Sequence, residues 1–176
     1  MNFGESVRFL HSLGHELKVV KRDLERIQTL VATLGNPHGR GRFIHVAGTN
    51  GKGSTCAMLE SIYRAAGWRT GLFTSPHLVS FAERIQVDRH LISQADVARL
   101  TKKIRDAIDA LGAETAPTFF EVVTVMALKY FEEQQCDVVI WETGLGGRLD
   151  ATNIVTPLAS VITNVQLDHQ QWLGQT

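Results

Sequence analysis

The residues best suited to chemistry stand in one stretch, HVAGTNGKGST, which runs from His45 to Thr55. A phosphate loop needs glycines that let backbone N–H groups approach phosphate oxygens, a lysine for the outer phosphates and a hydroxyl for magnesium. The stretch holds all of these, as Gly48, Gly51, Lys52, Gly53, Ser54 and Thr55. The pattern therefore predicts a phosphate-binding loop.

One position departs from the common phosphate-loop pattern. Serine or threonine usually follows Gly-Lys directly, whereas Gly53 stands there in this chain. The alternative interpretation is a flexible strand-to-helix turn with an incidental lysine. The context favours phosphate binding, because the preceding run FIHVA is typical of a strand and the pattern from Lys52 to Ala66 is typical of a helix.

Other reactive side chains follow predicted strands. Glu142 ends the apolar run DVVIWE, where its carboxylate could hold magnesium beside a phosphate loop, although a solvated strand-end acid fits the spacing equally well. Imidazole is not a typical magnesium ligand, so chemistry alone makes His169 an ordinary loop histidine, and His77 is similar. Asp150 lies in the glycine-rich run GLGGRLDATN and could bind a substrate or cap the following turn.

The hydrophobic pattern indicates which elements position these residues. Strands are expected in FIHVA (43–47), RTGLFTS (69–75), DVVIWE (137–142) and LASVITNV (158–165), the last two as buried strands. After a first helical stretch, helices are expected over 17–34, 52–66, 97–112 and 119–134, with a capping box beginning at Ser93. This order predicts an α/β fold with a mostly parallel sheet flanked by helices, whose strand ends gather the glycine-rich motifs.

Composition narrows the class of protein. The chain has 176 residues, a length that suggests one domain, and equal numbers of basic and acidic residues, 18 of each. This neutral balance argues against nucleic acid as a partner. No apolar run is long enough to span a bilayer, and Cys56 and Cys136 are far apart, as expected for reduced thiols in a cytoplasmic protein.

The motifs taken together are more specific than any of them alone. HVAGTNGKGST, FTSPHL, ERIQV, WETGLGGRLDATN and LDHQQWLG occur in this order, and they resemble the dihydrofolate synthase/folylpolyglutamate synthase family within the Mur ligase superfamily. The resemblance covers nearly the whole chain. It also accounts for Gly53, because the loop of this family reads Gly-Lys-Gly-Ser or Gly-Lys-Gly-Thr. The implied fold is a P-loop NTPase-like Mur ligase ATPase domain, here truncated.

The resemblance implies an ATP-dependent ligase that joins L-glutamate to dihydropteroate, to folates, or to both. ATP phosphorylates the carboxylate of the pterin compound, and the amine of glutamate then attacks the acyl phosphate. The implied cofactor is Mg²⁺, with ATP as a co-substrate. We expect small-molecule partners, no nucleic acid, no membrane and a cytoplasmic monomer. The alternatives are another Mur-type amide ligase and a non-catalytic nucleotide-binding fragment.

The same resemblance assigns residues by position. It implies ATP binding by Thr49, Asn50, Gly51, Lys52, Gly53 and Ser54, and magnesium binding by Ser75, Glu142 and His169. It implies a pteroate pocket lined by Thr118, Phe120, Glu121, Asp150 and Ala151, in which Phe120 could stack on a pterin ring. Lys52, Glu142 and His169 are then the catalytic residues.

Family members continue well beyond LDHQQWLG. We therefore expect residues 1–176 to form an incomplete N-terminal and central ATP-binding domain. The C-terminal ligase domain is expected to be absent from this chain. On this interpretation the chain is a fragment that is inactive, or nearly so, by itself.

Overall fold

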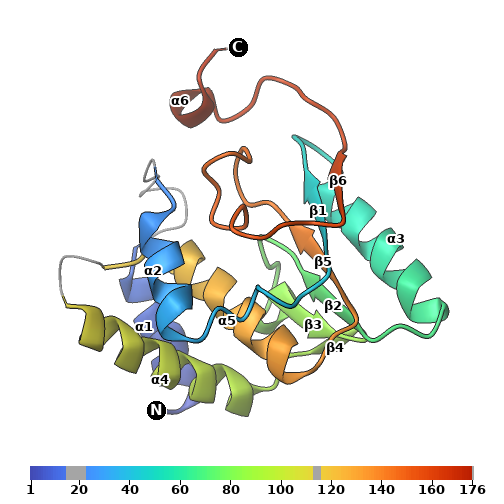
Figure 1. Ribbon diagram of the computed structural model, residues 1–176. Helices are drawn as coiled ribbons and strands as arrows, with labels where there is room; N and C mark the ends of the chain where they lie inside the picture. Colours follow the sequence, from blue (N-terminus) through green and yellow to red (C-terminus); the bar gives the residue numbers. More distant parts are fainter. Residues whose placement is uncertain (15–22, 113–115, 176) are drawn as a thin grey trace.

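The computed structural model describes residues 1–14, 23–112 and 116–175 of the chain. Within these residues a six-stranded sheet lies between helices that cover both of its faces (Figure 1). The sheet order is β4-β3-β2-β5-β1-β6. The strands are β1 (Phe43–Ala47), β2 (Thr70–Phe73), β3 (Ile85–Val87), β4 (His90–Leu91), β5 (Val138–Glu142) and β6 (Ala159–Ile162).

Strands β2, β5, β1 and β6 are parallel, and β3 and β4 add an antiparallel hairpin beside β2. The predicted α/β class with a mostly parallel sheet is therefore confirmed. The hairpin was not predicted, because its strands are only three and two residues long. All five residues of β5 are buried, as expected for a central strand covered on both faces.

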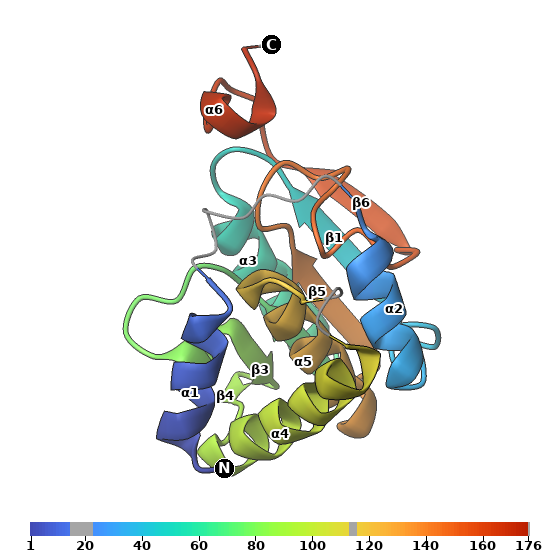
Figure 2. The ribbon, with the colours of Figure 1, turned by 90° about the vertical axis from the view of Figure 1, so that its left-hand side faces the viewer.

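Helix α3 (Lys52–Ala65) covers one face of the sheet, and the remaining long helices cover the other (Figure 2). These are α1 (Phe3–Ser12), α2 (Glu25–Thr33), α4 (Gln94–Leu111) and α5 (Phe119–Glu133). A 3-10 turn, η1 (Phe81–Arg84), precedes β3, and a short helix, α6 (Gln170–Leu173), lies near the C-terminus. The part of the predicted helix 17–34 that includes Leu17 and Val20 lies outside the described residues.

Alternation along the strands divides the core in two. Phe43 of β1 and Trp141 of β5 belong to the larger apolar cluster, which includes most of α5. Ile44, Val46 and Ile140, which lie one or three positions away on the same strands, belong to the smaller cluster that packs with α3. The same alternation determines on which face of the sheet the last side chain of each strand lies. It therefore determines which of these side chains lie beside the phosphate loop.

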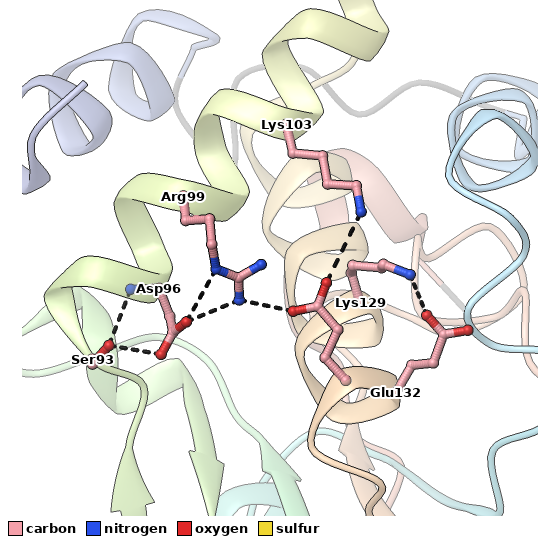
Figure 3. Close-up of polar contacts among 7 residues, drawn as sticks. Ser93, Asp96, Arg99, Lys103, Lys129 and Glu132 are labelled. Carbon is pink, nitrogen blue, oxygen red and sulfur yellow. Dashed lines mark hydrogen bonds and ion pairs between the residues drawn. The ribbon is translucent and has the colours of Figure 1, made fainter.

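Ser93 is the N-cap of α4, as expected, and it belongs to a network between α4 and α5 (Figure 3). The predicted capping box forms only in part, because the Asp96 carboxylate accepts from Ser93 Oγ at 2.7 Å instead of from the Ser93 backbone N–H. Ser93 Oγ accepts a hydrogen bond from the Asp96 backbone N–H at 3.0 Å, and Arg99 contacts Asp96 at 2.9 Å and Glu133 at 2.8 Å. Lys129 pairs with Glu132 on the same surface of α5. The Arg99–Glu133 pair joins the two helices, and because it is partly exposed its net stabilisation is small.

Two expectations about burial were wrong. The strand expected in LASVITNV is not buried, since Ile162 is 67% exposed and β6 pairs on one side only within the described residues. In α3, the spacing of Leu59, Ile62, Tyr63 and Ala66 predicts one apolar face, but Ile62 is 64% exposed. The face that packs on the sheet is instead formed by Cys56, Leu59 and Tyr63. No described helix combines the length and the apolar character that a membrane span requires.

Candidate functional site

The predicted phosphate loop joins β1 to α3 and opens that helix, as expected. Gly51 is the N-cap of α3 in a left-handed conformation with φ of 79°. Gly48 has φ of 133°, and a Cβ at this position would lie 2.1 Å from Thr163 Oγ1. Glycine is therefore required at Gly48 by conformation and by space.

The segment after β6 holds the phosphate loop in place. The Thr49 backbone N–H donates to the Asn164 backbone oxygen at 2.9 Å, and the Asn50 N–H donates to Asn164 Oδ1 at 2.9 Å. The Thr163 hydroxyl donates to the Asn50 carbonyl at 2.7 Å, and the Gln166 N–H donates to Thr49 Oγ1 at 3.0 Å. Sequence reasoning assigned no role to Asn164, which contacts the loop through both its backbone and its side chain.

Lys52 lies folded against the loop that it follows. Its Nζ donates to the backbone oxygens of Gly48 at 2.8 Å and Thr49 at 3.2 Å. These are neutral acceptors, so the positive charge of Lys52 is not paired with a carboxylate through either bond. A phosphate group in the loop would offer the lysine a stronger, charge-assisted interaction.

Glu142 is 3% exposed at the end of β5, on the face of the sheet that α3 covers. The Ser75 backbone N–H donates to its Oε2 at 3.0 Å. Burial raises the pKa of the Glu142 carboxyl, while this hydrogen bond and the charges of Lys52 and Arg84 oppose the rise. Its Oε1 would lie 3.7 Å from a Cβ on Gly53, so the start of the phosphate-loop helix faces this carboxylate.

The residues predicted to hold magnesium come from three segments of the chain: Ser75 follows β2, Glu142 ends β5 and His169 precedes α6. His169 is about two fifths exposed, with Nε2 3.8 Å from Asp168 Oδ2. Among the residues that the structure describes, no three His, Cys, Asp or Glu side chains come together as a metal site. Glu142 and the Ser75 hydroxyl offer the oxygen ligands that magnesium prefers, and they leave most of its shell to water and phosphate.

A cavity of about 930 Å³ lies at the carboxyl edge of the sheet. It extends from the phosphate-loop lysine to the residues predicted to bind the substrate. The predicted site residues that line it are Lys52, Ser75, Thr118, Phe120, Glu121, Asp150, Ala151 and His169. The other predicted residues lie outside that lining, namely Thr49, Asn50, Gly51, Gly53, Ser54 and Glu142. A cavity of this size fits a ligand as large as a pteroate or a nucleotide phosphate tail.

Two of the predicted substrate residues have structural partners in the protein. Thr118 and Glu121 form a capping box at the start of α5, in which the Thr118 N–H donates to Glu121 Oε2 at 2.6 Å. Glu121 also forms a nearly buried ion pair with Arg26 of α2 at 3.2 Å. Sequence reasoning assigned no site role to Arg26, which lines the cavity. Its only signal was its place in the run LERIQTLVATLGNP (24–37) before the phosphate loop, which shares the resemblance to the family.

Phe120 presents little surface to the cavity, since it is 8% exposed. Its ring lies 6.0 Å from that of Phe73, and a Cβ on Gly144 would come within 2.6 Å of it. Trp172 of α6, which was quoted only as part of LDHQQWLG, also lines the cavity and is 38% exposed. The cavity is therefore lined by two aromatic side chains. Phe120, the one predicted from the sequence to contact the substrate, is less exposed than Trp172.

Asp150 organises the glycine-rich loop that it belongs to. Its Oδ2 accepts the Leu145 N–H at 2.7 Å, and its Oδ1 accepts the N–H and the hydroxyl of Thr152 at 3.0 and 2.5 Å. Burial raises the pKa of the Asp150 carboxyl against these hydrogen bonds. Both roles left open by the sequence are compatible with this position, because Asp150 folds the turn and also lines the cavity.

The strand–loop–helix geometry defines an α/β nucleotide-binding domain of the P-loop kind. The family model for the Mur ligase middle domain matches residues 46–176, so the chain belongs to the Mur ligase family. The chain is 42% identical over 179 residues to the folylpolyglutamate synthase of Lacticaseibacillus casei. It is 46% identical over 160 residues to the dihydrofolate synthase/folylpolyglutamate synthase of Bacillus subtilis. The resemblance that the motifs indicated is thus confirmed.

The solved structure of E. coli FolC in complex with DHPP and ADP matches with a TM-score of 0.89 and 40% identity. That match covers 100% of this chain and 41% of the E. coli chain. The sequence matches cover 100% of this chain and 41% of the L. casei protein, and 89% of this chain and 37% of the B. subtilis protein. The chain therefore spans about two fifths of the length of these relatives.

Proposed function

We propose that the chain is part of an ATP-dependent ligase that joins L-glutamate to dihydropteroate, to folates, or to both. The observation that carries the proposal is the cavity of about 930 Å³, which places Lys52 of the phosphate loop in one space with Thr118, Phe120 and Asp150. The L. casei relative is a folylpolyglutamate synthase and the B. subtilis relative is a dihydrofolate synthase/folylpolyglutamate synthase, and the E. coli protein has DHPP and ADP bound; these relatives support the proposal.

The proposed reaction has two steps. A carboxylate oxygen of the pterin substrate attacks the γ-phosphorus of ATP, the bond to the β-phosphate oxygen breaks, and ADP leaves. The glutamate amine then attacks the acyl carbon, loses a proton and displaces phosphate, which leaves an amide. Holding the two substrates in line supplies much of the rate of such a phosphoryl transfer.

The phosphate-loop residues Thr49 to Ser54 are proposed to hold the ATP phosphates. In this role Lys52 exchanges its contacts with the Gly48 and Thr49 carbonyls for the outer phosphate oxygens. The backbone N–H groups at the start of α3 would add their dipoles to the same anion. Lys52 is thereby proposed as a catalytic residue that stabilises charge on the transferring group.

Ser75, Glu142 and His169 are proposed to hold magnesium. When bound, it would neutralise phosphate charge. The buried carboxylate of Glu142, with the Ser75 N–H on one oxygen, suits a divalent cation, because burial makes its own charge unfavourable without a cation nearby. The remaining proposed residues, Thr118, Phe120, Glu121, Asp150 and Ala151, would surround the pteroate.

Residues 1–176 are proposed to be an incomplete ATP-binding domain, with a C-terminal ligase domain in the rest of a longer protein. The relatives support this, since each is more than twice as long as the matched region. Glutamate and adenine are proposed to bind mainly to that remainder. The whole protein is proposed to act as a cytoplasmic monomer on small molecules.

The test is phosphate release by the gene product read through to its natural stop codon, with ATP, magnesium and glutamate. Release that requires dihydropteroate and is lost in Lys52→Ala would support dihydrofolate synthase activity. Release only with reduced folates would indicate a folate-extending enzyme. Release with neither, but with another acid and amino acid, would indicate a different Mur-type ligase, and nucleotide binding without turnover would indicate a binding module.

A further inference from the structure

We infer that His45 is a positioning residue, which couples the strand that carries the phosphate loop to the glycine-rich loop 144–152 that lines the cavity. His45 lies on β1 three residues before Gly48, and it is 8% exposed. It belongs to none of the sets proposed above to bind ATP, magnesium or pteroate. The inference rests on the proposed function for the identity of the ligands, but not for the contacts that make up the coupling.

The His45 side chain joins three parts of the fold. Its Nε2 lies 2.8 Å from Thr152 Oγ1, at the end of the glycine-rich loop, and 3.0 Å from Thr143 Oγ1, just after β5. Both threonines are buried. One ring nitrogen therefore bridges β1, the end of β5 and the loop that follows it.

The direction of the hydrogen bond between His45 and Thr152 follows from Asp150. The Thr152 hydroxyl donates its proton to Asp150 Oδ1 at 2.5 Å, so toward His45 it can only accept. His45 must then carry its proton on Nε2. Burial lowers the pKa of His45, and the opposing effect of Asp150 is smaller, so a neutral ring with a proton on Nε2 is the form that donates.

The contacts continue from His45 to the wall of the cavity. Asp150 receives the Thr152 hydroxyl on one oxygen and the Leu145 N–H, at 2.7 Å, on the other. The Thr152 carbonyl accepts from Trp141 Nε1 at 3.0 Å. Asp150 thus ties both ends of the glycine-rich loop together, and His45 attaches this loop to the strand that positions the phosphates.

A buried histidine can also be a core residue whose only role is to satisfy its own hydrogen bonds. The coupling makes a different prediction, because loss of the Nε2 donor should loosen loop 144–152 and weaken the pteroate side of the cavity first. The phosphate loop has its own attachment to Asn164 and should be affected less. The coupling therefore predicts a larger change in the KM for the pterin substrate than in the KM for ATP, whereas a purely structural role predicts no such difference.

The experiment uses the full-length gene product with His45→Gln, which keeps an N–H near the Nε2 position, and His45→Leu, which does not. In His45→Leu we expect amide hydrogen exchange in 144–152 to rise about 10-fold, with the KM for dihydropteroate or folate rising about 10-fold and that for ATP less than about 2-fold. We expect His45→Gln to stay within about 3-fold of wild type in each measurement. Equal changes in both KM values, no change, or no recovery in His45→Gln would overturn the coupling.

Thr152→Val provides a second route to the same contact if His45→Leu does not fold. It keeps the side-chain shape and removes the hydroxyl that links His45 to Asp150, so it should raise exchange in loop 144–152 in the same way. Hydrogen exchange needs no ligand. If the wild type released no phosphate with any folate, the proposed function would fail, whereas unchanged exchange in Thr152→Val and His45→Leu would overturn the coupling itself.

Discussion

The Ser75 backbone N–H donates to Glu142 Oε2 at 3.0 Å. The bond links the residues just after β2 to the end of β5, which are parallel neighbours in the sheet. It fixes a buried carboxylate beside the start of the phosphate-loop helix, where a Cβ on Gly53 would lie 3.7 Å from its other oxygen. If phosphates bind in this loop as proposed, a charged Glu142 requires a cation nearby, because like charges at short range repel strongly in a buried site.

Glu142→Gln tests that requirement. Glutamine can still accept from Ser75, so the fold should be kept, while the charge that attracts magnesium is lost. We expect phosphate release to fall by about 100-fold or more at saturating ATP, and the magnesium concentration for half-maximal rate to rise. Release by full-length protein over a magnesium titration measures both. A variant with the wild-type rate and the wild-type magnesium requirement would rule out Glu142 as a metal ligand.

Lys52→Ala should reduce phosphate release by about 100- to 1,000-fold, because one charged donor to the transferring phosphoryl group is removed. The substitution also frees the Gly48 and Thr49 carbonyls, so loosening of the loop must be measured separately. Lys52→Met, which keeps most of the side-chain volume, is the matched control. Equal losses in both variants, with unchanged thermal unfolding, would assign the effect to the charge. Near-normal release by either would contradict the proposed role.

Gly48 and Gly53 form a matched pair of glycines in the same loop. Gly48→Ala would place Cβ 2.1 Å from Thr163 Oγ1 in a backbone region that alanine avoids, so we expect destabilisation and loss of ATP binding. Gly53→Ala puts Cβ no closer than 3.7 Å to another residue, at the second position of α3. It should stabilise the helix by up to about 1 kcal/mol. Thermal unfolding and ATP titration of both variants measure this difference. A Gly48→Ala variant with the stability and the ATP affinity of the wild type would refute the prediction.

The sequence predicted the central strands, α3, α4, α5 and the phosphate loop because each has a strong local signal. Helix α5 shows this well, since Thr118 and Glu121 form a capping box before a long apolar run. The β3–β4 hairpin was missed because two very short strands carry no periodicity. The wrong expectation for β6 has a different cause: an apolar run such as LASVITNV reads as buried in sequence, but Ile162 lies on an edge strand.

The sequence predicts the site as a set of motifs, but it does not predict the contacts that these motifs make inside the protein. The motifs give no sign that Glu121 pairs with Arg26, 95 residues away in the chain, or that His45 contacts Thr152, 107 residues away. Such contacts depend on the register of strands and the packing of α2 on α5, which a local pattern does not record. They also change the interpretation of predicted binding residues, since Glu121 and Asp150 now have structural partners of their own.

The Arg26–Glu121 pair should matter for stability as well as for the cavity. Its two side chains are 13% and 8% exposed, and removal of one member leaves the other charge without its partner. We expect Arg26→Met to cost about 3 kcal/mol in the free energy of unfolding. The double variant Arg26→Met/Glu121→Gln should recover part of this cost, because no unpaired charge remains. Denaturant unfolding of the wild type and the variants measures this, and equal costs for the single and double variants would show that the ion pair is not the cause.

The last prediction concerns pH and His45. Burial lowers the pKa of this histidine below its ordinary value of 6.5, so the unfolded chain takes up the proton at a higher pH than the folded protein. The part of the free energy of unfolding that depends on neutral His45 is therefore fully present above pH 6.5. It is lost as the pH falls from there toward the lowered pKa, by at most about 1.4 kcal/mol per pH unit. His45→Gln removes this titration and leaves Asp150 in place. Thermal unfolding of full-length wild type and His45→Gln, compared at about pH 7.5 and about pH 5.5, should show the larger drop in the wild type. Parallel curves would mean that His45 binds its proton equally well in the folded and unfolded states, and they would contradict a lowered pKa for His45.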